Sequence, residues 1–333
     1  MTTEKIGQFS APMNVRISAV ICTRDRPQLL RNAIQSLVDQ TLNETLYEIR
    51  VIDNGSGEAP RHAAIAGFET VRNLRVVVEP VEGLSRARNT GWQSAAGEYV
   101  AYLDDDATAE PQWLEVLLQR LEGGQVDGIG GPVQLIWERD PADWLPRKYW
   151  RSLGYIDLGP SAKPLRFPDY PYGCNMGFRK AALEAVGGFP ASLGRVGPRM
   201  LSNEEKAVFW MFEQKHLAVW YEPRAMVSHF VPASRMTPAS MIRSWRGQAT
   251  SDAILQAQVQ KRRTGYLAYR LLKSIAGMLT IDAANAVIAR PPIRRLEARL
   301  FHAYRRAYIH QLFRIICRSM NPMSVSPESD PPA

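Results

Sequence analysis

Three consecutive carboxylates, at residues 104–106, stand directly after an apolar run that is typical of a buried strand, residues 99–103. Because alternate residues of an extended chain face the same way, we expect Asp104 and Asp106 to share one side. Carboxylate oxygens in that arrangement are hard ligands that suit Mg²⁺ or Mn²⁺. The alternative is an acidic turn that is simply solvated.

A second acidic pair, Glu204 and Glu205, precedes a segment with helical periodicity. One of these carboxylates can act as a general base on a hydroxyl. The alternative is that both glutamates are there because the positive N-terminus of a helix favours acidic residues. His229 is a candidate third metal ligand or phosphate contact if it reaches the region of Asp104 and Asp106, although a lone histidine is more often structural.

Further polar residues have the chemistry to bind a nucleotide. Arg235 can hold a diphosphate by bidentate hydrogen bonds, and Arg86 and Asn89, three residues apart, share a helix face. Asp53 ends a predicted strand, where it can accept hydrogen bonds from a base or ribose or can cap a turn. Residues 173–177, with two glycines, either bring backbone close to a ligand or form a tight turn. A solvated surface is the alternative for the arginines.

The elements that must position these residues alternate along the chain. We expect strands at 15–22, 47–53, 74–78, 98–103, 128–137 and 217–221, and helices at 29–38, 59–68, 84–96, 111–121, 181–186 and 205–214. This order predicts an α/β fold, a mostly parallel sheet with helices on both faces. Ligands bind such sheets at the carboxyl ends of the strands, where the polar clusters 23–26, 53–56 and 104–106 lie. Residues 138–172 read as a long loop with one short helix.

Composition excludes several classes of protein. Hydrophobic residues make up 45% of the chain and charged residues 22%, which is typical of a globular protein and not of a disordered or fibrous one. The three cysteines cannot all pair and indicate reduced thiols. Residues 1–14 lack the apolar core of a signal peptide, and the most apolar stretch, residues 274–289, is too short to span a membrane and contains Asp282. We therefore expect a cytoplasmic protein.

The net charge of +8 is unevenly distributed. Residues 232–320 hold 16 Lys and Arg against three Asp and Glu, whereas residues 1–231 are slightly acidic. Within the basic part, residues 293–318 predict an amphipathic helix. It either lies on an anionic membrane surface, as a peripheral protein at the inner face, or packs on the catalytic domain. No nucleic-acid motif is present, so we expect no nucleic-acid partner.

In this order the motifs resemble family 2 glycosyltransferases of the GT-A fold, over about residues 15–235. Residues 17–27 are similar to the family's first strand and nucleotide loop, and residues 51–56 are similar to its second nucleotide turn. The family's Arg/Asn helix is matched by residues 83–91, and its DxD motif is matched by residues 102–106. Its donor–acceptor segment resembles residues 173–179 and 187–189, its acidic catalytic pair resembles residues 203–205, and the segment that closes its site resembles residues 221–229. The expected organisation is a flexible N-terminus (1–14), a GT-A catalytic domain (15–235), a basic C-terminal α-helical extension (236–320) and a disordered tail (321–333).

The resemblance implies inverting transfer of one sugar from a nucleotide-diphosphate donor, of UDP type, to a hydroxyl of a glycan or lipid-linked acceptor. It implies Glu205 as the base, with Glu204 beside it, and Mn²⁺ or Mg²⁺ held by Asp104, Asp106 and His229. The implied donor-nucleotide ligands are Thr23, Arg24, Arg26, Asp53, Asn54, Arg86, Asn89, Asp104 and Arg235. The implied sugar contacts are Gly173, Cys174, Asn175 and Met176.

The sequence departs from the family pattern in three places. Residues 22–26 lack the common small–aromatic–Asn pattern, and the base position is Glu rather than Asp. The Gln-x-x-Arg-Trp signature of processive members is absent, which favours addition of a single sugar.

Two alternatives stay open. A sugar nucleotidyltransferase is expected to carry a Gly-rich phosphate loop, and residues 23–27 contain no glycine. A catalytically inactive GT-A-fold binding or scaffold protein would not need Asp104, Asp106, Glu205 and His229 intact.

Overall fold

The chain forms two compact units. The computed structural model describes residues 3–4, 14–142, 144–282 and 292–320. The first unit comprises residues 1–138, 148–191 and 204–231, and the second comprises residues 139–147, 192–203 and 232–333. The chain therefore passes between the units several times, and two short segments from the first 203 residues belong to the second unit.

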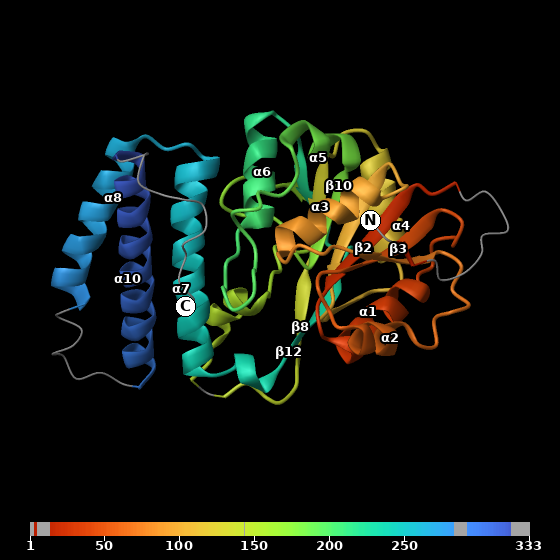
Figure 1. Cartoon of the computed structure of the whole chain (residues 1–333), viewed down its shortest axis with the longest axis horizontal. Coiled ribbons are helices and arrows are strands. Elements are labelled where there is room, and N and C mark those ends of the chain that lie inside the picture. Colours follow the sequence, from red (N-terminus) through yellow and green to blue (C-terminus); the bar gives the residue numbers. More distant parts are fainter. Residues whose placement is uncertain (1–2, 5–13, 143, 283–291, 321–333) are drawn as a thin grey trace. The chain divides into compact units, whose positions relative to one another are not determined.

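A nine-stranded mixed sheet forms the centre of the first unit (Figure 1). Its order is β1 (Thr3–Glu4), β4 (Leu74–Val78), β3 (Tyr47–Asp53), β2 (Ile17–Thr23), β5 (Tyr99–Asp104), β10 (Asn175–Arg179), β7 (Gly128–Gly130), β11 (Val219–Tyr221) and β9 (Lys163–Pro164). Strands β4, β3, β2 and β5 are parallel, whereas β10 runs antiparallel to both of its neighbours. A smaller sheet contains β6 (Ala107–Ala109), β12 (Val227–Val231) and β8 (Val133–Trp137).

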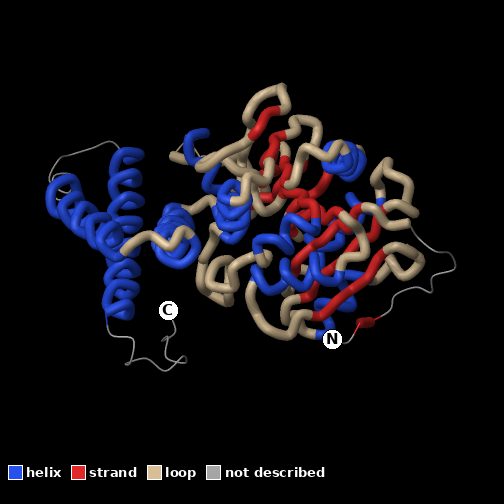
Figure 2. Tube along the Cα trace, turned by 90° about the horizontal axis from the view of Figure 1, so that it is seen from above, coloured by secondary structure: helices blue, strands red, loops and turns tan. Residues whose placement is uncertain are grey.

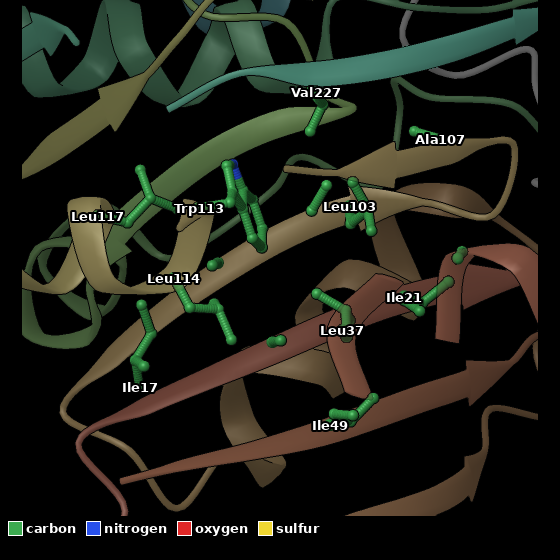
Figure 3. Close-up of a cluster of buried hydrophobic side chains, with 14 of the residues drawn as sticks. Ile17, Ile21, Leu37, Ile49, Leu103, Ala107, Trp113, Leu114, Leu117 and Val227 are labelled. Atoms are coloured by element: carbon green, nitrogen blue, oxygen red, sulfur yellow. The ribbon is translucent and has the colours of Figure 1, made fainter. Parts of the chain in front are cut away.

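The central strands are buried on both faces, which explains their continuous apolar sequences. On β2, Ile17 and Ile21 face one hydrophobic cluster and Val20 faces another. On β5, Leu103 belongs to the first cluster and Tyr102 to the second. Figure 3 shows the first cluster, where side chains of the sheet meet those of the helices on one of its faces.

Helices cover both faces of this sheet (Figure 2). Side chains of α1 (Pro27–Val38), α2 (Glu58–Ile65) and α4 (Trp113–Glu122) pack into the first cluster, and those of α3 (Leu84–Ser94), α5 (Lys180–Val186) and α6 (Glu204–Gln214) pack into the second. On α3, a Cβ at Gly91 would lie 2.6 Å from a methyl carbon of Val20, so glycine lets this helix lie close to β2. The predicted α/β class with helices on both faces is confirmed.

Three expectations about local structure are wrong. The predicted strand 128–137 is two strands in different sheets, because Gly131 and Pro132 interrupt the ladder between β7 and β8. The tight turn that was one of two alternatives for residues 173–177 does not include residues 175–177, which begin strand β10. His229, for which no element was predicted, lies inside strand β12. Thr3–Glu4 of the N-terminus, predicted to be flexible, pairs with β4.

The long loop 138–172 contains a 3₁₀ helix, η1 (Arg147–Leu153), where one short helix was expected.

The second unit is helical. It contains η2 (Ala233–Arg235), α7 (Pro238–Ile254), the π-helix η3 (Leu255–Val259), α8 (Thr264–Gly277), the π-helix η4 (Met278–Asp282) and α10 (Pro292–Met320). Helix α10 contacts both α7 and α8 (Figure 1). Between α7 and α10, Asp252 accepts hydrogen bonds from Tyr304, Asn203 and Gln248. No helix within the described residues is both long enough and apolar enough to cross a bilayer.

Much of the apolar stripe predicted on 293–318 is buried inside this unit. Tyr308 and Leu312 of α10 form a cluster with Ala249 and Ala253 of α7 and Leu267 of α8. Helices of the same unit cover this part of the stripe. It is therefore not exposed for contact with a membrane or with the catalytic domain, the two contacts that the sequence suggested. The predicted tail 321–333 lies outside the described residues.

Two adjacent residues of α10 test this packing. Leu312 is fully buried, whereas Phe313 is 59% exposed. We expect Leu312→Ala to lower the free energy of unfolding of the helical unit by about 2–5 kcal/mol, because it removes buried methyl groups and leaves a cavity. Phe313→Ala, the matched control, should change it by less than about 0.5 kcal/mol. Hydrogen exchange of α10 amides measures both, and equal effects would show that Leu312 does not pack as described.

Candidate active site

A buried arginine on α3, Arg88, joins two acidic segments that lie far apart in the sequence. Its Nη1 donates to Oε1 of Glu204 at 2.6 Å and its Nη2 donates to Oδ1 of Asp104 at 3.1 Å. The Arg88 side chain is 2% exposed, and its guanidinium also lies over the ring of Phe189. Burial alone would lower the pKa of Arg88, but the carboxylates of Glu204 and Asp104 raise it above its usual value. Arg88 therefore stays charged and ties the end of β5 to the start of α6.

The two glutamates at the start of α6 have different surroundings. Oε1 of Glu204 accepts from Arg88, whereas its Oε2 is buried without a hydrogen-bond partner among the described residues. Burial and the neighbouring Glu205 raise the pKa of Glu204 to about 7. Glu205 is half-buried, and within the described parts of the chain its carboxylate makes no hydrogen bond or ion pair. Of the pair, Glu205 is thus the one whose carboxylate no described residue engages.

Of the three aspartates at residues 104–106, Asp104 pairs with Arg88, whereas Asp105 and Asp106 share Arg26. Strand β5 ends at Asp104, and the next two residues form a turn. Asp105 accepts from Oγ1 of Thr23 at 2.8 Å and from Nη1 of Arg26 at 3.1 Å, and Asp106 accepts from the same nitrogen at 3.2 Å. Strand β5 ends at Asp104, so the expectation that Asp104 and Asp106 share one side, which rests on strand alternation, stays a prediction.

Burial and repulsion by Asp106 raise the pKa of Asp105 to about 7, while Arg26 opposes the shift. The Arg26 side chain is 42% exposed. Its partial removal from water would lower its pKa, but the carboxylates of Asp105 and Asp106 raise that pKa above its usual value. Two of the three aspartates therefore depend on one exposed arginine for their positive partner.

Asp106 and His229 are the predicted metal ligands that lie together. Nε2 of His229 is 3.2 Å from Oδ1 of Asp106, and the backbone N–H of Phe230 donates to the carbonyl oxygen of Asp106 at 2.8 Å. A carboxylate and an imidazole fit Mn²⁺ or Mg²⁺ when substrate oxygens and water complete the shell. Asp104 faces Arg88 instead. Across the described ranges, no group of three or more His, Cys, Asp or Glu side chains is arranged to hold a metal ion.

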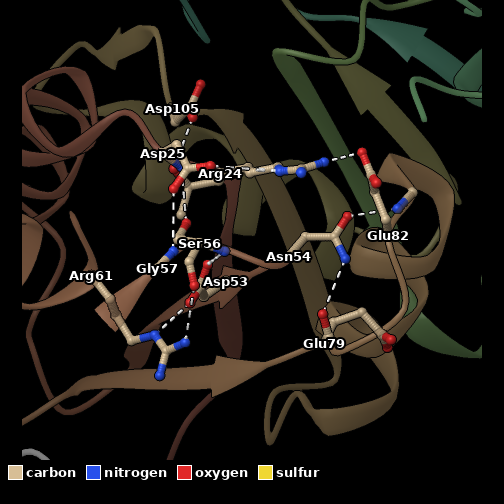
Figure 4. Close-up of polar contacts among 12 residues, drawn as sticks. Arg24, Asp25, Asp53, Asn54, Ser56, Gly57, Arg61, Glu79, Glu82 and Asp105 are labelled. Atoms are coloured by element: carbon tan, nitrogen blue, oxygen red, sulfur yellow. Dashed lines mark hydrogen bonds and ion pairs between the residues drawn. The ribbon is translucent and has the colours of Figure 1, made fainter. Parts of the chain in front are cut away.

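Asp53 lines a small recess at the carboxyl ends of β2 and β3, and Figure 4 shows its polar contacts. The Asp53 side chain is 1% exposed. Its carboxylate accepts hydrogen bonds from the backbone N–H of Ser56 and from Arg61. Thr23, Arg26 and Arg61 also line the recess. A base or ribose that reached Asp53 would therefore meet Arg61 as well.

Two predicted nucleotide ligands, Asn54 and Asn89, use their side-chain amides to hold loops. Asn54 donates to the carbonyl oxygens of residues 79 and 81 and accepts from the N–H of Gly83, which orders the loop before α3 (Figure 4). Asn89 donates to the carbonyl oxygen of Phe189 and accepts from its N–H, both at 2.8 Å, and also accepts from Nε1 of Trp92. These bonds give both asparagines a structural role.

The remaining predicted nucleotide ligands are arginines in different places. Arg24 is exposed at the end of β2 and pairs with Asp25 and Glu82 (Figure 4), and Arg86 is exposed on α3. Arg235 belongs to η2 of the second unit, so its contact with a diphosphate stays a prediction.

The predicted sugar contacts, residues 173–176, lead into β10. A Cβ at Gly173 would lie 2.5 Å from Nη2 of Arg88, so glycine lets the backbone approach the guanidinium. Asn175 and Met176 are 0% exposed, which is not compatible with the predicted contact. The Asn175 amide bonds to Nε1 of Trp113 and to the carbonyl oxygens of residues 132 and 225. Cys174 is also buried, and burial raises the pKa of its thiol well above the usual value.

Sequence reasoning missed the roles of Arg88, Asp105 and Arg61. A signal for Arg88 was present: it lies four residues after Leu84 and four before Trp92, a spacing that places it on the apolar face of the helix. An arginine on such a face needs acidic partners, since burying an unpaired charge is costly. The roles of Asp105 and Arg61 depend on turns that no periodicity predicts.

Residues 18–186, about half of the chain, match the protein family described as glycosyl transferase family 2. Among curated proteins, the chain is 28% identical over 219 residues to a glucosyl-dolichyl phosphate glucuronosyltransferase of Haloferax volcanii, covering 65% of this chain and 69% of that protein. It is 24% identical over 262 residues to the succinoglycan biosynthesis protein ExoM of Rhizobium meliloti, covering 76% and 79%.

Among solved structures, the chain is similar to a mannosyltransferase, PcManGT, of Pyrobaculum calidifontis in complex with GDP-Man and Mn²⁺. The TM-score is 0.54, the sequence identity is 19%, and the likeness covers 95% of this chain and 92% of that one. At this identity the likeness concerns the fold alone.

Replacement of Arg88 tests its place between the two acidic segments. We expect Arg88→Met to lower the free energy of unfolding by about 3–5 kcal/mol, because Glu204 and Asp104 would lose the charge that pairs them in a buried place. Arg86→Met, on the exposed side of the same helix, is the control and should cost less than about 0.5 kcal/mol. Urea unfolding measures both variants.

A second substitution makes this test specific. Adding Glu204→Gln to Arg88→Met removes one of the unpaired carboxylates, so the double variant should recover part of the loss in a double-mutant cycle. Additive effects would contradict the pairing of Arg88 with Glu204.

Proposed function

The chain belongs to glycosyl transferase family 2 and is a glycosyltransferase of GT-A fold, and on that premise we propose that it transfers one sugar, with inversion, from a nucleotide-diphosphate donor to an acceptor hydroxyl. The observation that carries the proposal is the convergence of Asp104 and Glu204 on Arg88. It brings the DxD segment and the acidic pair to one place although 100 residues separate them in sequence, and it leaves Glu205 unengaged.

In the proposed reaction Glu205 accepts the proton of the acceptor hydroxyl. The hydroxyl oxygen forms the new bond to the anomeric carbon on the face opposite the donor diphosphate. The bond from that carbon to the diphosphate oxygen breaks, and the nucleoside diphosphate leaves with the electron pair. Arg88 supports this step by holding Glu204, so that only one carboxylate of the pair faces the acceptor.

The donor is proposed to lie along the carboxyl ends of β2, β3 and β5, the edge where ligands bind sheets of this kind. Thr23, Arg26 and Asp53 line the recess there. Asp106 and His229 would hold Mn²⁺ or Mg²⁺, and Asp104 would face the ribose or the metal. A bound cation would stabilise the charge that develops on the leaving diphosphate. The PcManGT structure, which holds GDP-Man and Mn²⁺, supports this class of donor and metal.

The acceptor is proposed to be a glycan or lipid-linked sugar. Support comes from two relatives, one named for action on a glucosyl-dolichyl phosphate and the other for succinoglycan biosynthesis. We propose a UDP sugar as the first donor to test, and a location in the cytoplasm, at the inner face of the membrane when the acceptor is lipid-linked.

Replacing the proposed base tests the mechanism. We expect Glu205→Gln, which keeps the shape of the side chain, to lower kcat by roughly 10²–10⁴-fold, the range for loss of a general base. Donor affinity, measured by calorimetry, should stay within about twofold because the proton transfer concerns the acceptor. Glu184→Gln, an exposed position on α5, is the control and should leave transfer unchanged. Retained transfer by Glu205→Gln would exclude it as the base.

Metal-dependent donor binding tests the role of Asp106. A panel of UDP and GDP sugars, scored by thermal shift with and without Mn²⁺, first identifies the donor. Asp106→Asn should then lower the Mn²⁺-dependent affinity at least about tenfold by removing a charged ligand, the scale expected for disturbing a metal site. Asp39→Asn, exposed after α1, is the control. Unchanged affinity of Asp106→Asn with Mn²⁺ would remove Asp106 from the metal site.

A further inference from the structure

Helix α8 carries an apolar stripe that no other part of the described chain covers. Tyr269, Leu272 and Leu279 are 58%, 66% and 67% exposed, and Ala276 between them is exposed as well. Their spacing of three, four and three residues places them on one helix face. With a rise of about 1.5 Å per residue, the stripe extends for about 15 Å along α8 and into the π-helix η4.

Exposed large hydrophobic side chains are concentrated on α8 and η4. Ten large hydrophobic side chains are exposed in the described residues, and four of them lie on α8 and η4: the three of the stripe and Tyr266, which is 37% exposed. Scattered exposed apolar residues need no explanation, but a contiguous group marks an interaction surface. The opposite face of α8 is the packed one, where Leu267 joins the core of the helical unit.

The residues around the stripe are basic. Lys261, Arg262 and Arg263 are exposed just before α8, and Lys273 is exposed within it. Helix α8 contains no Asp or Glu, and residues 232–320 as a whole hold 16 Lys and Arg against three Asp and Glu. Of those three, Asp252 is bonded to Tyr304, Glu297 pairs with Arg294, and Asp282 is the last residue of η4.

We propose that the outer face of α8, from Tyr266 to Leu279, docks on the surface of a bilayer that contains anionic lipid. Tyrosine suits the boundary between headgroups and acyl chains, because its ring is apolar and its hydroxyl is polar. Leu272 and Leu279 enter the acyl boundary, while Lys273 and the basic residues before α8 meet the lipid phosphates. A second protein copy is less well matched, since two such faces would bring like charges together.

This surface differs from the stripe of α10 that the sequence suggested, because that stripe is buried against α7 and α8. It goes beyond the proposed transfer reaction, and vesicle binding is measurable without donor or acceptor. A docked helical unit would keep the enzyme at the membrane, where a lipid-linked acceptor is found.

Vesicle co-sedimentation of the full chain tests the proposal. The wild-type chain should bind vesicles of phosphatidylcholine with phosphatidylserine, bind pure phosphatidylcholine at least about tenfold more weakly, and lose binding as salt is raised. The double variant Leu272→Glu with Leu279→Glu should reduce binding to the mixed vesicles at least about tenfold, since it places charge in the acyl boundary.

The matched control is Val81→Glu with Ile136→Glu, which makes the same change at two exposed aliphatic side chains of the first unit, 50% and 47% exposed. The control should bind vesicles like the wild type, and the α8 variant should keep wild-type transfer to a soluble acceptor. Glu205→Gln should bind vesicles normally, so loss of catalysis and loss of docking are separable.

Three results would overturn the proposal. They are vesicle binding that is equal for the α8 variant and the control, binding that does not depend on phosphatidylserine, and a wild-type dimer in light scattering that the α8 variant dissociates while vesicles are not bound.

Discussion

The fully buried guanidinium of Arg88 is the constraint on which the arrangement of the site depends. Removing a charge from water is costly, so it is tolerated only where acidic partners lie at hydrogen-bond distance. Arg88 meets that requirement with Glu204 and Asp104. This requirement also positions the acidic partners. The end of β5 and the start of α6 must each lie within hydrogen-bond distance of Arg88, which α3 holds close to the sheet. Gly173 completes the enclosure, since any side chain there would displace the guanidinium.

Burial also raises the pKa of one acid in each of two neighbouring pairs, and Arg88 opposes this shift at Glu204. Glu204 has a pKa near 7 because it is buried beside a second carboxylate, and Asp105 has one because it is buried beside Asp106. Under the proposed function, the arginines of the site are engaged by its own acids, so a divalent cation is the natural partner for an anionic diphosphate. This agrees with the slightly acidic composition of residues 1–231.

Much of the first unit could be predicted from sequence, because β-branched and aromatic residues concentrate in its strands; strands 47–53 and 74–78 have the predicted bounds. The site was less predictable. The partners of Asp104 and Asp106 depend on which arginines the fold brings to the end of β5, and the sequence pattern does not show them. Asn175 was expected to contact a sugar because residues 173–179 resemble the family's donor–acceptor segment, yet three buried groups use its hydrogen bonds. The acidic partners of Arg88 could not be predicted, because they lie on β5 and α6 and only the fold brings them to it.

The interleaved path of the chain has a consequence for biosynthesis. Residues 139–147 and 192–203 leave the ribosome before α7, α8 and α10, to whose unit they belong. Asn203 cannot form its hydrogen bonds with Asp252 and Gln248 until those residues have been synthesised, about 45–50 residues later. Neither unit is therefore a continuous cassette that a single recombination event could transfer to another gene. Loss of α7 would also remove the partners of Asn203, the residue that immediately precedes Glu204.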